Sequence, residues 1–190
     1  MQQDLSDPPH PAAPEEWLEF FTRDQARTIE AAMACIFPDD DLGPGAIEAG
    51  AVYYLDRSLA GAEHYYQAHY RAAVVALDKL ARARHRADFR DCTAEQQDTM
   101  VADLANDAAP QFGDTPTGPV FFELLRAHAL EGVFSDPAHG GNRNLSGWKL
   151  LGYPGPQPSY SHAEQQLDAP ILRDRIFTAA DYPLPVAEEP

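Results

Sequence analysis

The sequence predicts an all-α protein, a single irregular helical bundle of about five helices with a Pro-rich extended C-terminal tail. Three observations predict this class. Apolar residues recur at spacings of three and four in several stretches, which is the period of one helix face. Pairs of Thr and Gln three residues apart mark two helix starts. No run of alternating apolar and polar residues indicates a sheet.

Length and proline content divide the chain into one folded unit and two flanking segments. With 190 residues, 44% of them hydrophobic, the chain is long enough for one domain with its own core. Residues 1–19 are acidic and rich in proline, so a flexible lead-in is expected. Residues 20–153 hold the periodic segments and should form the helical domain. In residues 154–190 recurrent prolines prevent long regular structure, which predicts a wrapping tail with at most a short helix at 171–177.

The first helix is predicted from its cap. Thr22 can accept a hydrogen bond from the backbone of Gln25, and the Gln25 side chain can return the bond, which is a capping box. The apolar residues from Ile29 to Phe37 then recur at three and four. Pro38 should end the helix because proline cannot continue its hydrogen bonding.

Four further helices follow from the same signals. Residues 46–60 carry a helical stripe that stops at Gly61, a residue suited to a left-handed cap. Residues 63–86 lack glycine and proline and predict a long third helix. Residues 93–106 open with a second Thr-Gln capping box. After a Pro- and Gly-rich loop, residues 119–134 begin with a proline at a position where helices accept it.

Charge and hydropathy exclude several partners. The formal net charge is −16, which argues against nucleic acid or an anionic membrane surface, because both attract clustered Lys and Arg. Asp39–Asp41 lacks the ligand spacing of a calcium loop and is interpreted as a solvated acidic turn. No window approaches the roughly 20 apolar residues of a membrane span. The first residues lack the basic and apolar regions of a secretory signal, so a cytoplasmic location is expected as the sequence stands.

Two cysteines, Cys35 and Cys92, are too few for a disulfide framework and have no zinc-ligand spacing. Cys35 lies in an apolar run and is interpreted as a small core residue. Whether the two thiols pair across two helices is left open by the sequence.

The spacing of the candidate residues matches no catalytic or cofactor-binding motif. Gly140-Gly141 has neither the preceding strand nor the following helix of a nucleotide-binding loop, and no serine or cysteine nucleophile has a recognisable local setting. His128 and Glu131 are three apart on one helix, which is half of a di-iron carboxylate motif, and a histidine satisfied within the fold is the preferred interpretation. The prediction is no catalytic residue, no bound cofactor and no metal site in this chain.

The stretch 120–153 joins the fifth helix to a loop rich in glycine and asparagine. Asn and Gly make turns readily, which is a sufficient structural reason for the loop. The same loop also presents Arg143, Trp148 and Lys149, and Arg and aromatic residues are enriched at binding hot spots. These side chains therefore serve either a partner or the core of the chain itself.

Several segments, quoted in order, carry a family resemblance: FFTRDQARTIEAAMACIFP, GAIEAGAVYYLDRSLAG, YRAAVVALDKLAR and FFELLRAHALEGVFSDPAHGGNRNLSGWKLLGYPG. From about Phe20 to Gly155 the chain resembles the gluconate 2-dehydrogenase subunit 3 family, the small non-catalytic subunits of flavin-dependent sugar and polyol dehydrogenases. The last segment is the most specific, because FFELLR, GGNR and GYPG occur together and in order.

The resemblance implies an α-helical subunit bound to a large catalytic partner of the glucose-methanol-choline oxidoreductase type, which carries the FAD. In some complexes of this kind a cytochrome c subunit takes the electrons. The family often brings a twin-arginine export signal, which this sequence lacks. A periplasmic location remains the alternative, if the partner supplies export or a leader has been removed.

The resulting hypothesis is an accessory subunit that binds and stabilises, or helps to mature, the flavin-dependent subunit. Two alternatives are a helical-bundle metalloenzyme that uses His128 and Glu131, and a free-standing maturation chaperone that releases its client. The residues predicted to anchor a partner or support the loop are Phe121, Phe122, Arg126, Arg143, Trp148 and Lys149.

Overall fold

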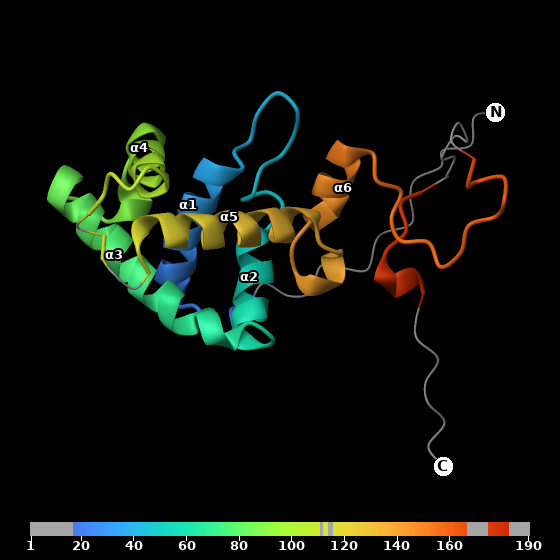
Figure 1. Cartoon of the computed structure of the whole chain (residues 1–190), viewed down its shortest axis with the longest axis horizontal. Coiled ribbons are helices and arrows are strands. Elements are labelled where there is room, and N and C mark those ends of the chain that lie inside the picture. The colour runs from blue at the N-terminus through green and yellow to red at the C-terminus, as the bar shows by residue number, and fades with distance from the viewer. Residues whose placement is uncertain (1–16, 111, 114–115, 167–174, 183–190) are drawn as a thin grey trace, which may run out of the picture.

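The computed structural model describes residues 17–110, 112–113, 116–166 and 175–182 (Figure 1). These ranges contain six α-helices, five single-turn 3-10 helices and no strand, which confirms the all-α prediction. The α-helices are α1 (Arg23–Ile36), α2 (Ala51–Ala60), α3 (Gln67–His85), α4 (Ala94–Ala105), α5 (Gly118–Phe134) and α6 (Ser146–Leu151). The 3-10 helices are η1 (His64–Tyr66), η2 (Phe89–Asp91), η3 (Pro137–His139), η4 (Arg143–Leu145) and η5 (Ala179–Asp181).

Helix α5 is the centre of the bundle and crosses the middle of the molecule in Figure 1. It packs against α1, α2, α4 and α6. Its contact with α2 is close because Gly132 faces the backbone of Ala51, where an added Cβ would lie 2.7 Å from the Ala51 Cα. The buried face of α5 is apolar except for His128, and its large members are Phe121, Leu125 and Val133.

Both predicted capping boxes are present. Gln25 N donates to Thr22 Oγ1 over 3.3 Å, and Thr22 N donates to Gln25 Oε1 over 2.9 Å. Thr93 and Gln96 exchange the same pair of bonds at the start of α4. Local sequence therefore determines where α1 and α4 begin, because each cap supplies partners for backbone N–H groups that have none within the helix.

Two predicted boundaries differ from the structure. The second helix was expected from residue 46 but begins at Ala51, because Gly50 takes a left-handed conformation with φ +68° and breaks the helical path. The third predicted helix opens as the 3-10 turn η1 before α3 begins. Of the short helix predicted at 171–177, residues 171–174 lie outside the described residues, and 175–177 are not helical.

Trp148 and Lys149 lie on α6, a short helix in a stretch where the sequence predicts a loop. Its six residues include Gly147, which has poor helix propensity. Tertiary contacts described below, rather than intrinsic propensity, hold this turn in helical form.

A buried carboxylate fixes the segment before α1. Asp56 on α2 is fully buried and accepts three backbone hydrogen bonds, from Glu19 N (2.5 Å), Phe20 N (3.1 Å) and Phe21 N (2.7 Å). Phe21 inserts into the core against Tyr70. Residues 19–21 are thus attached to α2 by charge-assisted bonds as well as by apolar packing.

The described part of the C-terminal tail returns to the bundle. Phe177 N donates to Pro154 O over 3.2 Å, and Ala179 N donates to Asp136 Oδ2 over 2.7 Å.

No described helix has both the length and the apolarity to cross a bilayer.

Cys35 and Cys92 are both free thiols and both half-buried. Burial, reinforced by a hydrogen bond to the Asp98 carboxylate, raises the pKa of the Cys35 thiol to about 12. Burial also raises the pKa of Cys92. Since only the thiolate is a good nucleophile, neither cysteine has the properties of a catalytic thiol.

We expect Cys35 to resist alkylation. At pH 8 a thiol with a pKa near 12 holds roughly a thousandth of the thiolate of an ordinary cysteine, so iodoacetamide should modify it at least a hundredfold more slowly than in the unfolded chain. Mass spectrometry of tryptic peptides over time measures the rate, and the same chain in urea is the control. Equal rates in the folded and unfolded chains would contradict the assignment.

Candidate functional site

The loop after α5 folds back onto the end of that helix through Asn142. This residue is fully buried and left-handed, with φ 46°. Its backbone N donates to Gly132 O over 2.8 Å, and its side-chain Nδ2 donates to Ser135 O over 2.8 Å. Its Oδ1 accepts from Gly147 N over 2.9 Å. One asparagine therefore joins the last turn of α5 to the first turn of α6.

Close backbone approach explains the glycines on either side of Asn142. A Cβ at Gly141 would lie 2.0 Å from Gly132 O, and one at Gly147 would lie 2.1 Å from Val133 O. No side chain fits at those distances. Packing against the backbone of α5 therefore requires glycine at positions 141 and 147.

Trp148 also packs onto the end of α5. Its side chain is 5% exposed, and its Nε1 donates to Phe134 O over 2.7 Å. The indole packs edge-on against Tyr153, with ring centroids 5.0 Å apart. Phe134 is the last residue of α5, where carbonyls lack helical partners, so Trp148 acts as a side-chain cap of that helix.

Arg143 connects the same loop to α2. Its backbone N donates to Ala49 O over 3.0 Å, and its guanidinium lies 4.2 Å from the centroid of the Tyr53 ring. Its side chain also passes over Gly50, where a Cβ would lie 2.5 Å from Nε. The loop therefore turns Arg143, like Trp148, toward the chain's own helices.

The other predicted anchors lie on α5 and α6. Phe121 is fully buried and stacks on Phe112, with centroids 5.6 Å apart, while Phe122 is half-buried at the edge of the core. Arg126 is exposed and pairs with Glu123 over 2.7 Å. Lys149 is exposed. Their role at a partner interface stays a prediction, and Arg126 and Lys149 are the two with exposed side chains.

Lys149 borders a surface hollow of about 340 Å³ between α6 and the segment before α2. Leu42, which is 79% exposed, forms part of its wall. Leu151, which is 63% exposed, comes directly after the lining residue Leu150 in the sequence. The complete lining is Leu42, Pro44, Glu48, Asn144, Ser146, Lys149 and Leu150.

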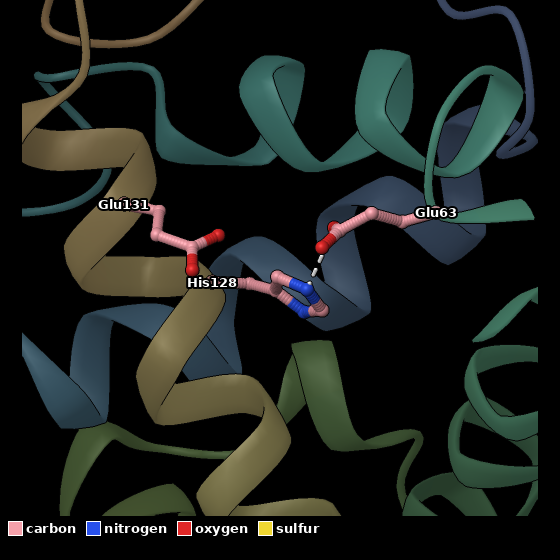
Figure 2. A group of neighbouring side chains, drawn as sticks. All are labelled: Glu63, His128 and Glu131. Carbon is pink, nitrogen blue, oxygen red and sulfur yellow. Dashed lines mark ion pairs between the residues drawn. The ribbon is translucent and has the colours of Figure 1, made fainter.

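A second cluster of polar side chains lies where α5 faces the connection between α2 and α3 (Figure 2). His128 is 2% exposed, and its ring projects from α5 toward Glu63, which comes from that connection. His128 Nε2 lies 2.8 Å from Glu63 Oε2, and Nδ1 lies 2.7 Å from the Tyr70 hydroxyl. Both nitrogens of the buried imidazole thus have a polar neighbour.

Glu131 completes this cluster from the next turn of α5. It is exposed and accepts a hydrogen bond from the Tyr54 hydroxyl over 3.1 Å. One ligand-capable atom from each of Glu63, His128 and Glu131 lies within 4.8 Å of the other two. Burial, together with the nearby charge of Glu63, raises the pKa of Tyr70 well above its usual value. Tyr70 therefore remains a neutral hydroxyl.

The sequence indicates two members of the cluster but not the third. His128 and Glu131 were recognisable from their spacing on one helix. Glu63 lies in a turn after Gly61, where an acidic residue has no distinguishing pattern. Only the path of the chain between α2 and α3 brings its carboxylate to His128.

Comparisons with known proteins give one result. The family model described as gluconate 2-dehydrogenase subunit 3 matches residues 23–155, which extends from the start of α1 past the end of α6 and includes both the folded loop and the polar cluster. Searches of curated proteins and of solved structures found no match. The match covers well over half of the chain, and the chain belongs to the gluconate 2-dehydrogenase subunit 3 family.

Proposed function

We propose that this chain is the non-catalytic small subunit of a flavin-dependent dehydrogenase complex. In it the chain binds and stabilises, or helps to mature, a large subunit of the glucose-methanol-choline type that carries the FAD and oxidises a sugar or polyol. The observation that carries the proposal is the family match, because it spans the whole helical bundle rather than one motif.

The use of polar groups supports an accessory role. Asp56 is saturated by backbone N–H groups, and Asn142 joins two helices. Neither cysteine is activated, since the pKa values of both thiols are raised. These groups stabilise the fold and present no reactive atom to a small substrate.

We propose that the partner binds to the surface around the hollow at α6. Leu42 lines the hollow and is 79% exposed, and two further exposed apolar side chains adjoin lining residues in the sequence: Leu151 (63%) follows Leu150, and Ile47 (47%) precedes Glu48. Exposed apolar side chains gathered at a depression and bordered by charge are typical of protein interfaces. Lys149 and Glu48 supply that border.

Co-expression tests the proposal. A large flavoprotein subunit of the proposed type should be soluble, flavin-loaded and active when it is produced together with this chain, and should lose most of its soluble, flavin-loaded form when this chain is omitted. The double variant Leu42→Asp/Leu151→Asp should weaken the complex at least about tenfold, because two charges would be buried at the interface. Pull-down and flavin absorbance measure both effects.

A matched control places the same charge elsewhere. Val75 on α3 is 67% exposed, close to the 63% of Leu151, and Val75→Asp should leave the complex unchanged. If the flavoprotein is equally soluble, flavinated and active without this chain, the accessory role is wrong. If the Leu42/Leu151 variant binds as well as Val75→Asp does, the role stands but the proposed face is wrong.

A further inference from the structure

The polar cluster between α5 and the α2–α3 connection has the composition of a metal site. We propose that Glu63, His128 and Glu131 bind one divalent first-row metal ion, with Zn²⁺ as the ion that best suits one imidazole and two carboxylates. The inference is independent of the proposed accessory function. A bound ion would join the connection between α2 and α3 to the central helix.

The spacing of the three donors fits a single ion. His128 and Glu131 are one turn apart on the same side of α5. Glu63 faces them from the connection between α2 and α3 (Figure 2). Ligand atoms around a tetrahedral zinc ion are about 3.3 Å apart. The three donor atoms already lie within 4.8 Å of one another, and the exposed Glu131 side chain can close the remaining gap by a rotamer change.

The surroundings of His128 orient it as a ligand. A metal-bound histidine usually donates its second ring N–H to a neighbouring polar atom, which fixes the ring and its tautomer. The Tyr70 hydroxyl lies 2.7 Å from Nδ1 and can accept that bond, which leaves the Nε2 lone pair directed toward the two carboxylates. Tyr70 is itself fully buried, so this orientation is rigid.

Glu63 provides the second independent observation. Its Oε2 is buried and has no hydrogen-bond donor among the described residues, although His128 Nε2 is only 2.8 Å away. The two atoms are at ion-pair distance but without hydrogen-bond geometry. A buried carboxylate oxygen without a donor is costly, and a cation shared with Nε2 would satisfy both atoms.

The charge of the cluster favours a cation. Two carboxylates surround one imidazole, in a chain whose formal net charge is −16. A divalent ion would neutralise both acids. The three protein ligands, one of which lies at the surface, leave a fourth coordination position open to water. A di-iron site would need a second set of ligands.

Zinc titration of the full-length chain tests the site. After EDTA treatment and removal of the chelator, calorimetric titration with ZnCl₂ should give saturable binding at one ion per chain. Glu63→Gln and Glu131→Gln should each lower the affinity at least about tenfold. Glu123→Gln, an exposed acid on the same helix outside the cluster, should leave the affinity unchanged. Circular dichroism checks that each variant keeps its helices.

X-ray absorption of the zinc-loaded wild-type chain gives a reading that needs no variant. Scattering from one imidazole in addition to carboxylate oxygens supports the assignment. A shell of oxygen alone, no saturable one-to-one binding, or equal affinity in wild type and in folded Glu63→Gln and Glu131→Gln would overturn it.

Discussion

Trp148→Ala is expected to lower the free energy of unfolding by about 3–5 kcal/mol, the usual cost of removing a buried aromatic side chain. The indole is 5% exposed and packs on Tyr153, so truncation leaves a cavity between α6 and the end of α5. It also removes the donor for Phe134 O, which lies 2.7 Å from Nε1. Both losses act on the isolated chain, with or without a partner.

Urea denaturation followed by circular dichroism measures this loss. Trp148→Phe should recover most of the packing but not the hydrogen bond, and should cost about 1–3 kcal/mol. The neighbouring Lys149→Ala is the matched control, because its side chain is exposed and should change stability by less than about 0.5 kcal/mol. If Trp148→Ala keeps wild-type stability and loses only the partner, the indole serves the interface rather than the core.

The starts of α1 and α4 were predictable because their determinants are local. Each is set by a Thr and a Gln three residues apart, and the structure contains both bonds of each box. The same holds for α5, which opens with a proline near its first residue and continues with an apolar face. Where short-range chemistry decides, sequence is sufficient.

The start of α2 and the existence of α6 were not predictable in this way. Gly50 takes a left-handed conformation just before α2, and the side chain of Arg143, a residue far away in sequence, lies so close that a Cβ at Gly50 would be 2.5 Å from its Nε. Helix α6 forms where Gly147 fits against Val133 O and Trp148 reaches Phe134 O. Periodicity cannot report contacts between segments whose relative positions are still unknown.

The same reason limits prediction of the candidate sites. Arg143 and Trp148 are of residue types enriched at binding hot spots. The residue type alone does not say whether a side chain faces a partner or the core of its own chain. In the metal-binding proposal, His128 and Glu131 share a helix and were recognisable as a pair. Glu63 joins them through tertiary structure only.

Asp56→Ala should be among the most damaging single changes in the chain, at about 3–5 kcal/mol. The fully buried carboxylate accepts three backbone N–H groups, and its removal leaves those of Phe20 and Phe21 without their acceptor at the edge of the core. Each orphaned buried donor costs about 1–3 kcal/mol. Asp56→Asn should cost less than alanine, since one side-chain oxygen remains to accept.

Hydrogen exchange locates the effect of this change. In the wild type the amides of Glu19, Phe20 and Phe21 should be protected, and in Asp56→Ala they should exchange faster than amides in the middle of α5, because the segment detaches before the bundle unfolds. Asp41→Ala, which removes an exposed carboxylate, is the control and should leave both stability and exchange unchanged. Continued protection of these three amides in Asp56→Ala would mean that packing of Phe21, and not the carboxylate, attaches the segment to α2.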